Sequence, residues 1–98
     1  MTEVRLEAVS PGCYRLIGEL DFDSVPALAG RGRELFSADG DVQVSLDAVE
    51  RVDSAGLVLL VDWLREARRR GRGISFTCVP PQLLALARVS GVDELLAL

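Results

Sequence analysis

The hydrophobic period changes from two residues to about 3.6 within residues 42–67, and this change most constrains the fold. Apolar and polar residues alternate over 42–47, which predicts a strand that ends at a bend carrying Asp47 and Glu50. Further on, apolar side chains recur at helical spacing; they are Leu57, Leu60, Val61, Leu64 and Ala67. The stretch therefore predicts a helix that begins near Asp53 and Ser54, directly after a buried strand.

The rest of the chain continues this alternation of strands and helices. Residues 4–20 predict a hairpin with its turn at 10–12, residues 25–36 predict one helix behind Ser24, and residues 74–79 predict a strand. A last helix starts at Pro81 and ends at Gly91, and residues 92–98 predict one helical turn packed on the body. The whole order predicts one α/β domain over residues 1–98. We expect a mostly parallel sheet of four or five strands, with an antiparallel first strand and about four helices.

The charge and the apolar pattern of the chain exclude several classes of protein. A net charge of -4 argues against nucleic acid as the main partner, because phosphate binding needs a positive surface. The arginines of residues 65–72 follow the central helix toward its end, where a solvated helix terminus is the simpler interpretation and an accessory contact with an anionic surface is the alternative. The sequence shows no apolar run long enough to cross a bilayer and no signal peptide. We therefore expect a cytoplasmic protein that does not insert into a membrane.

The residue types that carry most enzyme chemistry are missing from the sequence. Neither histidine nor lysine occurs, and there is no phosphate-binding loop or dinucleotide fingerprint. Cys13 and Cys78 are expected to be core thiols rather than metal ligands. Asp21 and Asp23 form a carboxylate pair, but no third ligand for a hard cation lies nearby, so we interpret them as a loop acid and a helix-start acid. These observations predict a protein without enzymatic activity, metal or cofactor.

The start of the central helix is the candidate functional site. Ser54 is expected to cap the helix and Asp53 to complement its positive end, which is also what an ordinary N-cap would look like. Val58 and Leu59 fall off the core side of the helical wheel, so a hydroxyl, a carboxylate and two apolar side chains would share one exposed surface. Because ligands gather at the carboxyl ends of parallel strands, we expect Asp21 to lie close to this surface.

Three short motifs resemble those of the STAS domain family, the fold of anti-sigma-factor antagonists. They are Gly18-Glu19-Leu20-Asp21 after a strand, Val52-Asp53-Ser54-Ala55-Gly56-Leu57 at the start of a helix, and Pro80-Pro81-Gln82-Leu83. The resemblance covers nearly all 98 residues. Within the family, residues 53–57 and 86–92 are most similar to the small cytoplasmic subunits of phospholipid-transport ABC complexes.

This resemblance implies a protein that binds a partner and catalyses nothing. The partner would be the ATPase subunit of an ABC transporter, which would hold the protein at the inner membrane; the alternative is an anti-sigma factor with serine kinase activity. In the antagonists the phosphorylated hydroxyl precedes the glycine, and Ala55 stands there, so phosphorylation is not expected unless Ser54 replaces it. Weak self-association remains open. The expected partner-binding residues are Asp21, Asp53, Ser54, Ala55, Gly56, Leu57, Val58 and Leu59.

Overall fold

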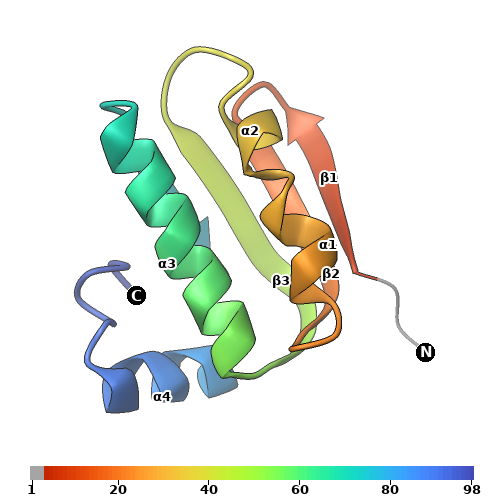
Figure 1. Ribbon diagram of the computed structural model, residues 1–98, viewed down its shortest axis with the longest axis vertical. Coiled ribbons are helices and arrows are strands. Elements are labelled where there is room, and N and C mark those ends of the chain that lie inside the picture. Colours follow the sequence, from red (N-terminus) through yellow and green to blue (C-terminus); the bar gives the residue numbers. More distant parts are fainter. Residues whose placement is uncertain (1–3) are drawn as a thin grey trace.

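The computed structural model describes residues 4–98, which form a four-stranded sheet and four helices (Figure 1). The strands are β1 (Arg5–Ser10), β2 (Cys13–Leu20), β3 (Val42–Val52) and β4 (Ile74–Thr77). The helices are α1 (Val25–Ala29), α2 (Gly32–Leu35), α3 (Ser54–Arg69) and α4 (Pro81–Ser90). The strand order is β1-β2-β3-β4, with β1 antiparallel to β2 and the other pairs parallel. The predicted mixed sheet with an antiparallel first strand is confirmed.

Helices α1, α2 and α3 cover one face of the sheet, and α4 lies across the end at which α3 begins (Figure 1). Alternate residues of β2 are buried toward this helical layer, among them Tyr14, Leu16 and Leu20. The hydroxyl of Tyr14 donates to the carbonyl oxygen of Glu34 over 2.6 Å, which ties the end of α2 to the sheet. The core therefore lies between the sheet and the helices, as the alternating pattern of the strands requires.

The opposite face of the sheet carries polar side chains. Arg15 of β2 donates to Asp47 of β3 over 3.0 Å, and the hydroxyl of Ser45 donates to the same carboxylate. Cys13 also lies on this face, half-buried, and Cys78 is exposed after the end of β4. The expectation that both thiols belong to the core was therefore wrong. The strand-like sequence around each cysteine does not say which face of the sheet the thiol occupies.

Strand β3 is longer than the sequence pattern predicted. It continues through Asp47 and Glu50 to Val52, so the expected carboxylate-rich bend does not exist. Parallel pairing to β2 persists over this segment, with two register shifts that absorb extra residues of β3. These irregularities break the strict alternation of side chains. The sequence pattern therefore did not predict a strand in the second half of β3.

The single helix expected over residues 25–36 is two short helices. Helix α1 ends at Ala29, with Gly30 as its C-cap, and α2 begins at Gly32. Arg31 lies between them, and its guanidinium donates to the carboxylate of Glu34 and to the carbonyl oxygen of Leu6. The break follows from Gly30 and Gly32, since glycine in a helix interior is less favourable than alanine by about 1 kcal/mol.

The C-terminal part of the chain has the strand and the helix that the sequence predicted, and the difference lies in where the strand ends. Strand β4 stops at Thr77 rather than residue 79, because Cys78 takes a positive φ of 54°. Helix α4 begins at Pro81 and ends at Ser90; its C-cap is Gly91, whose φ of 74° is the left-handed conformation that glycine tolerates. Residues 92–98 form one hydrogen-bonded turn, in which the backbone N–H of Leu96 donates to the carbonyl oxygen of Val92 over 3.0 Å as in a helix, and Leu96 packs into the core, as predicted.

Candidate functional site

Asp53 links the start of α3 to the loop that follows β2. One oxygen of its carboxylate accepts hydrogen bonds from the backbone N–H groups of Ala55 at 2.8 Å and Gly56 at 3.4 Å. The other oxygen accepts from the backbone N–H of Phe22 at 3.3 Å. Asp53 is thus the N-cap, and the prediction that Ser54 caps the helix was wrong. Ser54 is the first helical residue, which leaves its hydroxyl exposed to solvent.

A second carboxylate, that of Asp21, is hydrogen-bonded within the β2–α1 loop. Asp21 accepts from the backbone N–H groups of Asp23 at 3.0 Å and Ser24 at 2.9 Å. The hydrogen bond from the Ser24 backbone, together with the others, holds the pKa of Asp21 below its ordinary value. Because Phe22 also donates to Asp53, the carboxyl ends of β2 and β3 meet at one place, as predicted for Asp21, Asp53 and Ser54.

Gly56 lets α3 approach the sheet closely. A methyl group at this position would lie 2.7 Å from Cγ2 of Val52, 2.8 Å from Cβ of Leu20 and 2.9 Å from the carbonyl oxygen of Leu20. Leu57 follows it into the core and is 5% exposed. Gly56 and Leu57, both expected in the partner-binding set, therefore face inward. Gly56 presents no side chain on the surface, and Leu57 contributes only the small exposed part of its side chain, at the groove beside α4.

The two apolar residues predicted to share the exposed surface have opposite environments. Val58 is 57% exposed, whereas Leu59 is only 2% exposed and belongs to the core. The predicted exposure of Leu59 was wrong because α3 packs against α1 as well as the sheet, which widens its buried face beyond the single stripe assumed from the sequence. Val58 remains the exposed apolar side chain of the first turns.

Phe22 is a candidate residue that the sequence analysis missed. Its side chain is 80% exposed, and its backbone N–H donates to Asp53 at the start of α3. An exposed aromatic side chain next to a helix start is a common anchor of protein interfaces. A signal was present in the sequence, since Phe22 is the one apolar residue in the polar run Asp21-Phe22-Asp23-Ser24.

A mostly apolar groove of about 260 Å³ runs between α3 and the end of α4. Ser54, Val58 and Val61 line it on the side of α3, and Ser90 and Val92 line it on the side of α4. Charged side chains of α3 stand at the same groove, namely those of Asp62 and Arg65, which form an ion pair at 3.9 Å. The groove and the exposed Val58 make one continuous surface beside the helix start.

No group of three or more side chains that could hold a metal ion occurs within residues 4–98. Over the same residues, no helix combines the length and the apolar character needed to cross a membrane.

Three comparisons with known proteins agree with this architecture. The family model described as "Mlab, STAS domain" matches residues 8–97. The intermembrane phospholipid transport system binding protein MlaB of Haemophilus influenzae is 33% identical over 86 residues, which cover 84% of this chain and 82% of that protein.

Solved structures of the anti-sigma factor antagonist SpoIIAA share the fold. Its unphosphorylated form superposes with a TM-score of 0.73 at 20% sequence identity, over 93% of this chain and 83% of that one. The phosphorylated form of the Bacillus protein gives a TM-score of 0.69 at 19% identity, over 93% and 86%. On the match to the family model and to a curated relative, the chain belongs to the STAS domain family.

Proposed function

We propose that this protein is a non-catalytic STAS subunit that binds the ATPase subunit of an ABC-type phospholipid transporter and supports its assembly or activity. The observation that carries the proposal is the surface at the start of α3, where Ser54, Val58 and the groove toward α4 are exposed beside Phe22. This surface offers apolar area and a hydroxyl to a partner. The name of the curated relative, a phospholipid transport system binding protein, supports the same function.

The alternative is an anti-sigma-factor antagonist that is switched by phosphorylation. The shared fold of SpoIIAA favours it, but the residue before Gly56 is Ala55, which has no hydroxyl. Ser54 is exposed one residue earlier and is the nearest side chain that a kinase would reach. A kinase partner therefore requires either transfer to Ser54 or a switch without phosphorylation, and the transporter function needs neither.

A binding role without catalysis is consistent with the side chains at the helix start. The sequence has no histidine or lysine to serve as a general base. The carboxylates of Asp21 and Asp53 are each engaged by backbone N–H groups, which fixes them as structural acceptors. On this proposal the protein works in the cytoplasm and reaches the inner membrane only through its ATPase partner.

The test is affinity purification of the protein and its variants from the native cell, with identification of the proteins that co-purify. The wild-type protein should retain an ATPase with Walker motifs. Ser54→Arg and Val58→Glu should lose it, since placing a charge at an interface anchor commonly costs about 2 kcal/mol or more, roughly thirtyfold in affinity. Thermal melting should show that both variants remain folded, because both positions are exposed.

Val9→Glu provides the matched control, since it introduces the same charge at an exposed valine of β1, far from α3. It should bind the ATPase like the wild type. Recovery of an anti-sigma kinase instead of an ATPase would establish the alternative. Undiminished ATPase binding by the folded Ser54→Arg and Val58→Glu proteins would place the interface elsewhere on the molecule.

A further inference from the structure

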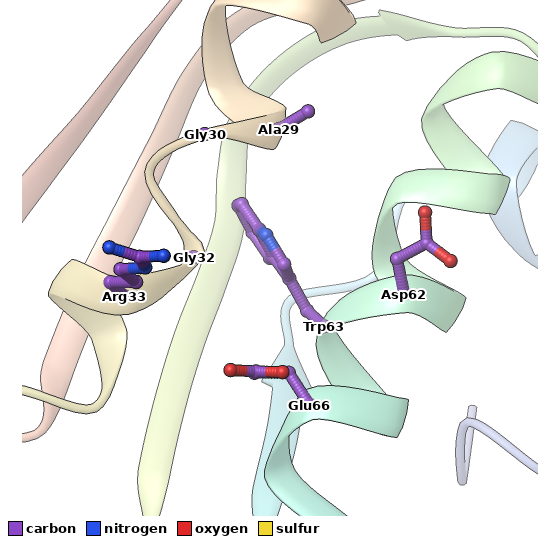
Figure 2. A pocket seen from close by; sticks show the side chains of 7 residues that line it. All are labelled: Ala29, Gly30, Gly32, Arg33, Asp62, Trp63 and Glu66. Carbon is purple, nitrogen blue, oxygen red and sulfur yellow. The ribbon is translucent and has the colours of Figure 1, made fainter.

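A hollow of about 400 Å³ lies between α3 and the link from α1 to α2, and Trp63 rises from α3 toward the glycines of that link (Figure 2). The carboxylates that α3 presents there are already ion-paired, Glu66 with two arginines of the same helix and Asp62 with Arg65. The side chain of Trp63 is only 3% exposed. These side chains are therefore paired within the protein or out of reach of a ligand.

A smaller notch lies at the edge of the sheet, where β4 stops before β3 does. Strand β4 pairs with Val42–Ser45 of β3, whereas β3 continues to Val52. Within residues 4–98, no strand therefore pairs with residues 46–52 on the side of β4. The notch, of about 160 Å³, lies in this gap, between residues 49–52 of β3 and residues 80–82. An interior strand of the sheet thus lacks one of its two neighbours over this stretch.

The chain that follows β4 does not fill the gap itself. Cys78 takes a positive φ of 54°, which turns the chain out of the direction of β4. Pro80 and Pro81 come next, and proline has no backbone N–H that could donate to a neighbouring strand. Residues 80–82 therefore form the far wall of the notch instead of a strand paired with β3.

At one point of the gap, a side-chain amide stands where a neighbouring strand would be. The backbone N–H of Val52 donates to Oε1 of Gln82 over 3.3 Å, which is longer than the usual range of about 2.7–3.2 Å. Gln82 is exposed and lines the notch, so its side chain can leave without disturbing the core. The acceptor that Val52 uses is an amide oxygen, the group that a main-chain carbonyl also presents. An incoming main chain can therefore take over this hydrogen bond.

The shape and the charges of the notch restrict what can enter it. Because residues 80–82 wall off its far side, a narrow extended chain fits, whereas the broad edge of a second sheet does not. Glu50 and Arg51 line the notch with opposite charges, which favour neither an acidic nor a basic segment. Valines and prolines supply the apolar part of the lining. Val52 directly precedes Asp53, so the notch adjoins the proposed partner surface at the start of α3.

We propose that the notch binds an extended, uncharged segment of a partner polypeptide, which adds to β3 as a strand beyond the end of β4. A main-chain carbonyl of this segment accepts from the N–H of Val52 in place of Gln82. In strand addition of this kind, main-chain hydrogen bonds give the affinity, and alternate side chains contact the wall of the site. The inference does not rest on the proposed function, because it needs neither the ATPase nor the groove beside α4.

The two glutamines of the sequence, which has no asparagine, allow the binding to be followed by NMR. Isotope-labelled full-length protein is titrated with the capped peptide acetyl-Thr-Val-Thr-Val-amide. The side-chain amide of Gln82 and the backbone N–H of Val52 should move to a saturating value. The side-chain amide of Gln43, at the other end of β3, should stay in place. The same peptide with its main-chain nitrogens methylated should bind about tenfold more weakly or less well still, because it cannot donate to β3.

Variants of Gln82 test whether this side chain holds the place of a strand. Gln82→Ala removes the competing acceptor and should tighten peptide binding by about threefold or more. Gln82→Glu supplies a charged acceptor, which binds an N–H more strongly, and should weaken peptide binding by a similar factor. Ala85→Glu is the matched control, since it adds the same charge at an exposed position of α4 outside the notch, and it should bind like the wild type. All three are followed through the Val52 N–H, and thermal melting shows that they are folded.

Four results would overturn the proposal. Resonances of Gln82 and Val52 that stay in place up to the solubility limit of the peptide would exclude strand addition at the notch. Equal affinities for the peptide and its methylated form would show that main-chain donors do not carry the binding. Equal shifts with N-methylacetamide at the same amide concentration would assign the notch to single amides. Equal peptide binding by Gln82→Ala and Gln82→Glu would show that the N–H of Val52 is not the donor.

Discussion

Asp53 is the residue on which the geometry of the candidate site depends most directly. Its carboxylate bonds to backbone groups of α3 and of the β2–α1 loop, and thereby holds two segments that are far apart in the sequence. Ser54 directly follows it and makes no such contact, although either residue type is a good N-cap. The N-cap residue must have an extended backbone conformation rather than a helical one. Asp53 has the extended conformation, so it caps the helix and Ser54 does not.

Replacing Asp53 should therefore cost more stability than replacing Ser54. Asp53→Ala removes the cap and should lower the free energy of unfolding by about 1–2 kcal/mol. Ser54→Ala, the matched control, exchanges an exposed hydroxyl in the first turn for a methyl group and should change stability by less than about 0.5 kcal/mol. Urea denaturation of the three proteins measures both effects. A larger loss in Ser54→Ala than in Asp53→Ala would contradict the capping arrangement.

At the residue scale the sequence predicted where α3 begins and which loop it meets better than it predicted which side chains are exposed there. The change of period located the helix start, and the convergence of Asp21, Asp53 and Ser54 followed from the order of the strands. Leu59 was misplaced, because a helical wheel does not show that α1 covers a second side of α3. Phe22 was missed, since an apolar residue in a short polar loop has no periodicity to reveal its exposure.

Among the elements, the turn between α3 and β4 is fixed by one arginine. Arg72 donates to the carbonyl oxygens of Gly40 at 2.7 Å and Phe36 at 3.0 Å, and also to that of Ala38. Its guanidinium also stacks over the ring of Phe36, 5.2 Å from the centroid. The side chain thus joins the start of β4 to the loop between α2 and β3, which precedes the central strand.

Arg72→Ala should destabilise the fold by about 2 kcal/mol or more, because hydrogen bonds from a charged group are each worth about 1.5–3 kcal/mol. Arg68→Ala is the control; this exposed side chain of α3 should be replaceable at a cost below about 0.5 kcal/mol. Thermal melting gives the comparison, and amide hydrogen exchange should rise at residues 36–41 in Arg72→Ala alone. Equal melting temperatures for the two variants would remove Arg72 from this role.

The elements that the sequence predicted well are those with a strong local signal at both ends. The hairpin has its Pro-Gly turn, and α4 has Pro81 at its start and Gly91 after its end. The predictions failed where tertiary structure overrides a local pattern. Pairing with β2 extends β3 beyond its alternating part, and the two short helices replace the single helix expected over residues 25–36.

For the whole molecule, the lowered pKa values of several carboxyl groups predict how the free energy of unfolding depends on pH. Four carboxyl groups have pKa values below their ordinary values of 3.8 for Asp and 4.5 for Glu; they are Asp21, Glu34, Asp47 and Glu66. Arginine side chains cause the shift in three of them, and the backbone N–H of Ser24 is the main cause for Asp21. As the pH falls, the unfolded chain takes up protons before the folded protein does.

The stability that these four carboxylates contribute should therefore be complete above their ordinary pKa values. It should decline as the pH falls through 4.5 and 3.8. Between about pH 6 and about pH 8 it should be nearly constant, because the sequence contains no histidine. Urea midpoints measured from about pH 3 to about pH 8 give the profile. Asp47→Asn should make the acid decline less steep, and a stability maximum below pH 4.5 would contradict the prediction.

The close packing of Gly56 also determines how this molecule can change its sequence over generations. A side chain of any size at position 56 collides with Leu20 and Val52, so selection for a folded chain alone retains the glycine. Ser54 and Val58, within two residues on either side, face solvent and are free of that selection. If these two positions contact the partner, as proposed, mutations that alter recognition leave folding intact. On that proposal, a lineage could exchange one partner for another there without passing through a sequence that does not fold.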